Sequence, residues 1–266
     1  MSQRITPPPL SKVDLAGYDP GYTAEMKRRA GREERRQARV RLGKLQDVLY
    51  ADRRYGVLVV LQGTDTSGKD STANSVFEQV GPVGCSVTNF GVPSAEEASH
   101  DFLWRYHNNA PARGKVAIFN RSHYESVLVE RVHNIVPEST WRPRYDQLNR
   151  FEDMLVRENI IVMKFFLHIS REEQRERLQE RIDNPEKHWK FQPSDLEDRN
   201  SWEDYQAAYA DMLTYCNTKA APWHIVPADH KWYRDLVVLR AIIARLESLD
   251  LRYPLADVDM SGTVVV

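Results

Sequence analysis

The sequence is poor in cysteine. Only two cysteines occur among 266 residues, Cys85 and Cys216, and no CxxC pair is present. This scarcity excludes a framework of disulfide bridges and a zinc site built on cysteine pairs. We expect both side chains to be small core residues.

Long apolar runs and an excess of one charge are also missing. The apolar stretches cover only a handful of residues, far short of the roughly 20 that a membrane-spanning helix needs. The first ten residues are polar and rich in proline, without the apolar centre of a secretory signal. Lys and Arg number 37 against 38 Asp and Glu, which argues against non-specific nucleic-acid binding. We therefore expect a cytoplasmic protein with neither a membrane nor a nucleic-acid partner.

By composition the chain divides into three parts. Residues 1–22 are expected to form an extended N-terminal arm, because Pro7, Pro8 and Pro9 interrupt any periodic pattern. Residues 23–254 are expected to form one domain, and an apolar content of 41% is sufficient for its core. Within that domain a lid is expected at about 171–200. Residues 255–266 are expected to be a flexible tail.

Short apolar strands alternate with helical patterns along this domain. The candidate strands are 57–61, 86–90, 115–119, 160–169 and 223–226. The helical patterns are 23–52, 95–107, 140–157, 171–182, 202–219 and 232–249. Such alternation with buried-type strands predicts an α/β fold, a three-layer sandwich around a parallel five-stranded sheet.

The first helical pattern carries a basic cluster. Apolar residues at helical spacing predict that this helix packs on the core. Its cationic residues are interleaved with Glu33 and Glu34, and they are Lys27, Arg28, Arg29, Arg32, Arg35, Arg36 and Arg39. Two interpretations stay open: a solvated helical face, or an electrostatic approach path for a polyanion.

The strongest local signal is a phosphate-binding loop of the Walker A type. It runs Gly63-Thr64-Asp65-Thr66-Ser67-Gly68-Lys69, after a predicted strand and before a predicted helix. Glycines let backbone amides turn toward a phosphate, and the helix start adds unpaired N–H groups. We expect phosphate contacts from Gly63, Thr66, Ser67, Gly68, Lys69 and Ser71.

Two acids in or beside this loop predict a metal ion. Asp70 stands where Ser or Thr is usual, and Asp65 lies inside the loop. Carboxylates next to a polyphosphate anion repel it unless cations lie between them. We therefore expect Asp65 and Asp70 to help hold Mg²⁺. For Asp70 the alternative is a favourable interaction with the helix dipole alone.

A polar strand end follows the third predicted strand. Asn120 and Arg121 occupy the position where a Walker B acid would face the loop from the neighbouring strand. Arg121 is a candidate for stabilising phosphate charge during transfer. The alternative is a strand-end turn with no chemistry. His123 and Glu125, expected on the next helix, receive no role.

An Arg-rich helix follows the fourth predicted strand. Like charges one turn apart repel each other, and an anionic ligand would offset that cost. A polar segment punctuated by Pro185 comes next, which is typical of a lid that closes over phosphates. The candidates for phosphate contacts in this lid are Arg175, Arg177, Arg181 and Lys187, with a solvated helix as the alternative.

These motifs together resemble the polyphosphate kinase 2 family. The resemblance covers about residues 25–254 and rests on the loop, on the strand end 119–125, and on segments 184–191 and 221–235. It is greatest to the branch, class III, that accepts nucleoside mono- and diphosphates.

The family resemblance implies a thymidylate-kinase-like P-loop fold with a helical lid, Mg²⁺ dependence, and a homo-oligomer, dimer or tetramer. Its substrates would be inorganic polyphosphate and adenine nucleotides, with guanine nucleotides as an alternative. By motif position, Asp65, Lys69, Asp70, Asn120 and Arg121 would be the catalytic residues. Other branches carry Asp at the position of Asn120, which shifts metal binding toward Asp65.

The expected reaction is a direct in-line phosphoryl transfer from polyphosphate to AMP or ADP, giving ADP or ATP. An ionised phosphate oxygen is the acceptor, so no strong general base is needed. The enzymatic alternative is an ATP-dependent nucleotide or small-metabolite kinase. A nucleotide switch is a further alternative, but neither a guanine-reading motif nor an interaction domain is present.

Overall fold

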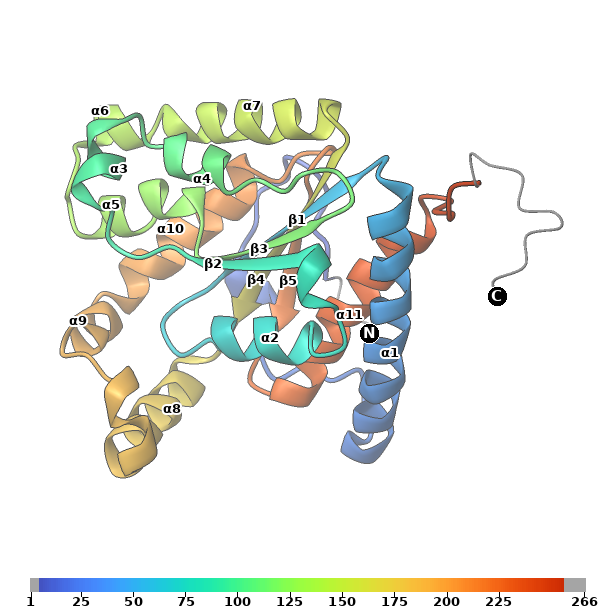
Figure 1. The fold of residues 1–266 in the computed structure, drawn as a ribbon. Helices are drawn as coiled ribbons and strands as arrows, with labels where there is room; N and C mark the ends of the chain where they lie inside the picture. The colour runs from blue at the N-terminus through green and yellow to red at the C-terminus, as the bar shows by residue number, and fades with distance from the viewer. Residues whose placement is uncertain (1–4, 256–266) are drawn as a thin grey trace, which may run out of the picture.

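The computed structural model describes residues 5–255, which fold around one parallel sheet (Figure 1). The strands are β1 (Gly56–Gln62), β2 (Cys85–Asn89), β3 (Val116–Asn120), β4 (Ile160–His168) and β5 (Trp223–Pro227). Their order in the sheet is β2-β3-β1-β4-β5, and all pairs are parallel. The predicted α/β fold with a five-stranded parallel sheet is confirmed.

Helices cover both faces of the sheet, giving the three predicted layers. The odd positions of β1, from Val57 to Leu61, pack against α1 (Arg28–Asp52), α2 (Lys69–Val76) and α11 (Lys231–Glu247). The even positions, Leu58 and Val60, face the helices α7 (Arg144–Arg157) and α10 (Trp202–Tyr215). Because both faces are covered, β1, β3 and β4 are buried along their whole length, which explains their continuous apolar runs.

Several predicted helices differ from the observed ones. The pattern at 95–107 forms two short helices, α3 (Ala95–Ser99) and α4 (Trp104–Asn108), separated by a turn in which the Asp101 carboxylate accepts the Leu103 N–H at 2.9 Å. The pattern at 140–157 is broken at Pro143, which has no N–H to donate, so α6 (Glu138–Trp141) precedes α7. The first helix starts at Arg28 rather than at residue 23, and α10 ends at Tyr215, four residues before its predicted end. His123 and Glu125 lie on a 3-10 helix, η3 (His123–Val127).

The remaining elements are one helix of 13 residues and several shorter ones. They are α5 (Val129–Val132), α8 (Arg171–Asp183), α9 (Ser194–Asn200), η1 (Leu15–Gly17), η2 (Pro82–Gly84) and η4 (Pro185–Lys190). Of these, α8, η4 and α9 make up the segment predicted as a lid, which projects from the body of the protein (Figure 1). Within residues 5–255 no helix combines the length and the apolar character needed to cross a bilayer.

The described part of the N-terminal arm runs along the outer edge of the sheet. The Ile225 N–H of β5 donates to the Ile5 carbonyl at 2.8 Å, and the Asn217 side chain donates to the carbonyls of Pro7 and Pro8. Val13 and Leu15 are buried in the core. The arm therefore covers the edge strand. Of the predicted tail, residues 256–266 lie outside the described residues.

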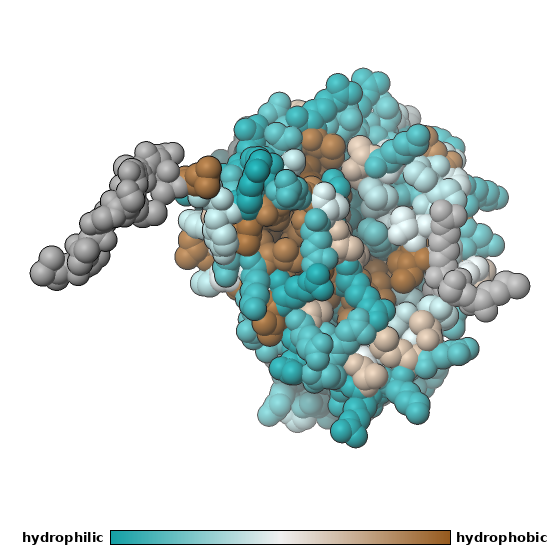
Figure 2. Space-filling view, turned by 90° about the vertical axis from the view of Figure 1, so that its right-hand side faces the viewer, coloured by the Kyte–Doolittle hydropathy of each residue, from teal (hydrophilic) through white to brown (hydrophobic). Residues whose placement is uncertain are grey.

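The side of the protein that carries α1 and the end of α11 is mostly hydrophilic. Apolar residues there gather in hollows between charged side chains (Figure 2). The core is thus screened on this side by the long charged residues of the outer helices.

Candidate active site

The phosphate loop lies at the carboxyl end of β1, where parallel α/β sheets bind their ligands. Gly68 has φ +97°, and a Cβ at this position would lie 2.0 Å from Nη1 of Arg234. Only glycine fits there without displacing that buried side chain. Thr66 is held at φ +66°, a costly conformation that is often found in ligand-binding loops.

Lys69 is held over the loop by its own backbone. Its Nζ donates to the carbonyls of Gly63 at 2.7 Å and Thr64 at 3.2 Å. Burial, together with nearby Arg121, lowers the pKa of Lys69, while Asp65 opposes this shift. The half-buried ammonium group is therefore held at the centre of the loop by two backbone carbonyls.

The loop also offers hydroxyl groups. Thr64 Oγ1, Thr66 Oγ1 and Ser67 Oγ are buried and find no hydrogen-bond partner among the described residues. Buried polar atoms are rarely left unpaired, so these atoms are candidates for ligand contacts. Ser71 differs, because its hydroxyl is exposed and donates to the Gly68 carbonyl at 3.0 Å.

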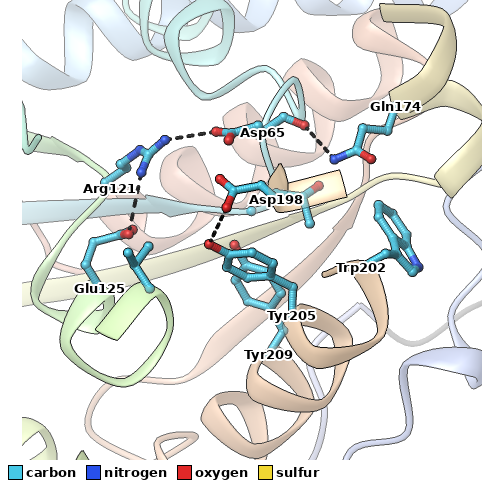
Figure 3. Close-up of a pocket in the computed structure, with 11 residues that line it drawn as sticks. Asp65, Arg121, Glu125, Gln174, Asp198, Trp202, Tyr205 and Tyr209 are labelled. Atoms are coloured by element: carbon cyan, nitrogen blue, oxygen red, sulfur yellow. Dashed lines mark hydrogen bonds and ion pairs between the residues drawn. The ribbon is translucent and has the colours of Figure 1, made fainter. Parts of the chain in front are cut away.

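Arg121 joins the loop to the end of β3 (Figure 3). Its Nη2 lies 2.9 Å from Asp65 Oδ1, and its Nη1 lies 3.7 Å from Glu125 Oε2. Its backbone has φ +59°, a second strained position at the site. Glu125, burial and Asp65 act on its guanidinium together, and the net effect raises its pKa. Arg121 is a permanent cation aimed at the loop.

Asp65 has acidic as well as basic neighbours. Burial alone would raise the pKa of its carboxyl group, but Lys69 and Arg121 outweigh burial and lower it. Asp198, on α9 of the lid, lines the same small pocket as Asp65, and it accepts from Tyr205 Oη at 3.1 Å. Burial and Asp65 raise the pKa of Asp198 to about 6. Figure 3 shows Asp198 lying between Asp65 and Tyr205.

Asp70 and Asn120 face each other across the mouth of the loop. The Asn120 Nδ2 donates to the Asp70 carboxylate and, at 2.7 Å, to Asn89 Oδ1 on β2. The structure thus places both residues together, as the strand-end position predicts. Asp70 and Asn120 also line the cavity described next.

The loop, the strand ends and the lid enclose a cavity of about 460 Å³, which we call the loop cavity. Its acidic side is formed by Asp65, Asp70, Glu180 and Asp195. Its cationic side chains are Lys69, Arg121, Arg177, Arg181, Lys187, Lys190 and Lys231. Because cations outnumber acids around it, the cavity suits a phosphate-rich ligand.

The four lid candidates occupy different positions. Arg181 pairs with Asp195 at 3.0 Å and Lys187 pairs with Glu180, and both line the loop cavity. Arg175 pairs with Glu172 on the exposed face of α8 and is not part of the cavity wall.

Arg177 also lines the cavity, but it is 93% covered and fully engaged. It donates to the carbonyls of Thr66 at 2.9 Å and Ala228 at 2.7 Å, and to Glu173. Its guanidinium therefore fastens the lid to the loop.

Several residues of the site carry no role in the sequence prediction. A buried pair, Arg234 with Asp235, supports the loop from behind, and Arg234 Nη1 lies 3.4 Å from the Ser67 carbonyl. Gln62 holds Glu125 at 3.0 Å. The sequence did carry a signal for three of these residues, because segments 119–125 and 221–235, which resemble the family, contain Glu125, Arg234 and Asp235. Asp198 lies outside these segments and has no such signal.

A Walker A loop at the end of a parallel sheet, with a strand-end arginine and a cationic lid, defines a P-loop kinase. The model of the Polyphosphate kinase 2 (PPK2) family matches residues 25–253. The chain therefore belongs to the polyphosphate kinase 2 family, which confirms the resemblance seen in its motifs.

Individual relatives agree with this assignment. The chain is 47% identical over 248 residues to the AMP/ADP-polyphosphate phosphotransferase of Meiothermus ruber, covering 92% of this chain and 93% of that protein. It is 43% identical over 226 residues to the ADP-polyphosphate phosphotransferase of Rhodopseudomonas palustris, covering 80% and 78%. It is also similar to the crystal structure of Polyphosphate Kinase 2 from Arthrobacter aurescens TC1, with a TM-score of 0.93, 37% identity, and coverage of 97% and 93%.

Proposed function

We propose that this chain transfers phosphoryl groups from inorganic polyphosphate to AMP and ADP, making ADP and ATP. The observation that carries the proposal is the loop cavity, in which a Walker A lysine, a strand-end arginine and lid cations converge on one volume. The relative from M. ruber, similar over nearly its full length, is by name an AMP/ADP-polyphosphate phosphotransferase. Similarity to this protein supports the proposal that the chain belongs to the branch that accepts both nucleoside mono- and diphosphates.

The reaction depends more on the alignment of the two phosphate groups than on general acid–base catalysis. An ionised oxygen of the acceptor phosphate forms a bond to the terminal phosphorus of polyphosphate. The bridging P–O bond breaks, and its electron pair stays on the shortened chain. Lys69 and Arg121 neutralise charge that builds on the transferred group, and the loop amides fix its position.

Further phosphate contacts belong to this proposal. We assign phosphate binding to Gly63, Thr66, Ser67, Gly68, Lys69 and Ser71 in the loop, and to Arg181 and Lys187 in the lid. Arg177 acts by holding the loop in place. Arg175 lies outside the cavity wall in this structure, so a phosphate contact from it requires a movement of α8.

The residues present fit a magnesium ion. Residues 5–255 contain no cluster of three acidic, His or Cys side chains that could cage a metal. Mg²⁺ prefers one or two carboxylates together with substrate phosphates, and Asp65 and Asp70 are placed to supply these beside the unpaired loop hydroxyls. When bound, Mg²⁺ would be held by Asp65 and Asp70 and would reduce the negative charge of the phosphate groups.

Two further predictions belong to this proposal. We expect one kinase domain whose lid spans about residues 171–200, in a cytoplasmic enzyme. We also expect a homo-oligomer, since the edge strand β2 leaves Val87 and nearby Val83 more than half exposed. Light scattering coupled to size-exclusion chromatography measures the oligomer directly.

The test is nucleotide analysis after mixing the purified protein, Mg²⁺ and long-chain polyphosphate with either ADP or AMP. We expect ATP from ADP, and ADP followed by ATP from AMP. Conversion of ADP alone would place the chain in a different branch of the family. Product formation only when ATP replaces polyphosphate as the donor would overturn the proposal in favour of an ATP-dependent kinase.

A further inference from the structure

A second cationic cavity lies beside the loop cavity, between the N-terminal turns of α1 and α11. It is an open groove of about 580 Å³, which we call the α1 groove. Its cationic and aromatic walls are Arg28, Arg32, Arg35, His230, Lys231 and Trp232. Both helices begin at the end of the sheet that carries the phosphate loop (Figure 1).

Two arginines of this groove, Arg28 and Arg32, form no ion pair with an acid among the described residues. The nearby acids of α1 are engaged elsewhere, because Glu33 pairs with Arg36 and Glu34 pairs with Arg240. Arg28 and Arg32 lie one helical turn apart, and no ion pair joins either of them to an acid within residues 5–255. Like charges at this spacing repel each other, so a bound anion would stabilise them.

The other charged groups of the groove are already paired. Arg35 lies 2.9 Å from the buried carboxylate of Asp235. The groove's single acid, Asp229, accepts the Ser170 N–H at 2.9 Å. The uncompensated charge therefore comes from Arg28, Arg32 and Lys231.

Close packing of helices fixes the shape of the groove. A Cβ at Gly31 would lie 2.1 Å from the ring of Trp232, so α1 approaches α11 at a distance that only glycine permits. Since α1 and α11 also pack along the core, the arginines stand on a rigid support. A rigid array of guanidinium groups suits a ligand that presents regularly spaced phosphates.

Lys231 connects the two cavities. It lines both the loop cavity and the α1 groove. Burial and neighbouring Arg177 lower the pKa of Lys231, which shows how closely cations crowd at this junction. The two cavities thus share one cationic side chain, past which a chain of phosphates that leaves the loop would enter the α1 groove.

We propose that the α1 groove binds the distal part of a long polyphosphate chain whose terminal phosphates occupy the loop cavity. This inference rests on the proposed function. A donor of three phosphates ends within the loop cavity, whereas a long chain reaches Arg28 and Arg32. The groove thereby gives the enzyme a preference for long donors.

The test compares the Arg28→Gln/Arg32→Gln variant with the unchanged protein on two donors. Binding of long-chain polyphosphate and of tripolyphosphate is measured by calorimetry without nucleotide, at constant ionic strength. Loss of two exposed charge contacts should raise Kd for the long chain about tenfold and Kd for tripolyphosphate less than about twofold. KM with ADP as acceptor should follow the same pattern.

Two further variants serve as controls. Arg29→Gln/Arg41→Gln removes the same charge from α1 outside the groove and leaves the Arg36–Glu33 pair intact, so both Kd values should stay unchanged. Arg28→Lys/Arg32→Lys keeps the charge and should recover most of the long-chain affinity. Unaltered thermal unfolding of all three variants verifies their fold.

The outcomes separate the inference from the proposed function. Equal weakening of both donors, or none, in the groove variant would overturn the groove assignment while ATP synthesis by the unchanged protein upholds the function. If the unchanged protein makes no ATP from either donor, the function itself fails.

Discussion

The support behind the phosphate loop and the lid above it are both built from ion pairs, but they differ in burial. Behind the loop, Arg234 and Asp235 are 1% and 2% exposed, and Asp235 also binds Arg35 and Ser75. In the lid, Arg175 and Glu172 are more than half exposed. Only Arg177 is buried among the lid arginines.

Because of this difference in burial, the ion pairs behind the loop and those in the lid have separate roles. A buried pair cannot lose one partner without leaving an uncompensated charge, so it fixes geometry. Exposed pairs exchange with water at little cost, so their cations remain available to a ligand. The loop is therefore held ready, while the lid keeps cations that can be redirected to phosphates.

The substitution with the largest expected effect is Lys69→Ala, which removes the ammonium group from the centre of the phosphate loop. We expect kcat to fall by about 10³-fold or more, because charge stabilisation of the transferred group is lost. Thermal unfolding should be almost unaffected, since Lys69 bonds only to loop carbonyls. Near-normal turnover would refute the assignment of the loop.

Asp235→Asn should break the support rather than the chemistry. Buried Arg234 would lose its carboxylate partner, and we expect about 3–5 kcal/mol of unfolding free energy to be lost. Urea denaturation measures this loss. Glu34→Gln, which breaks the exposed pair with Arg240, is the matched control and should shift the midpoint little. Similar losses in both variants would contradict the contrast between buried and exposed pairs.

Asp65→Asn tests the acid at the centre of the loop. We expect kcat to drop about 10²-fold and the magnesium titration to move to higher concentration, because one carboxylate beside the phosphates is removed. Asp195→Asn, on the lid side of the cavity, serves as the comparison and should shift the titration less. An unaltered titration in the Asp65 variant would argue against a metal-binding role.

The lid itself supplies the smallest expected effects. Arg181→Gln removes a cation from the cavity wall and should raise KM for polyphosphate about tenfold. Arg175→Gln removes one from the exposed face and should change KM by less than about twofold. Equal effects of the two variants would show that α8 turns both arginines toward the substrate.

Local sequence predicted the frame of this site well. The five strands are apolar runs ended by turns, and the loop is marked by Gly63, Gly68 and Lys69, so both were readable. Asn120 was predicted to face the phosphate loop, because the ends of neighbouring parallel strands meet at one edge, and in the structure it contacts Asp70 at the end of that loop. These features depend on residues close together in the chain or on the regularity of a sheet.

Contacts between distant segments were beyond such reasoning. The spacing of arginines on α8 does not predict that Arg177 points toward the core. One of its partners is the carbonyl of Ala228, which follows β5 and lies far along the chain. Asp198 lies near Asp65 only because the lid folds back over the phosphate loop, which the local sequence does not indicate. The breaks at residues 100–103 and at Pro143 were also missed, because apolar periodicity continues across each turn.

The N-terminal arm has a consequence for synthesis on the ribosome. Thr6 bonds to His224, 218 positions later in the chain, and α1 packs against α11, the last helix of the described residues. The arm and α1 must therefore wait for β5 and α11 to be translated before these partners are available. Until β5 emerges, the edge of β4 lies open to strand pairing with other nascent chains, so early chaperone binding should improve the yield of folded protein.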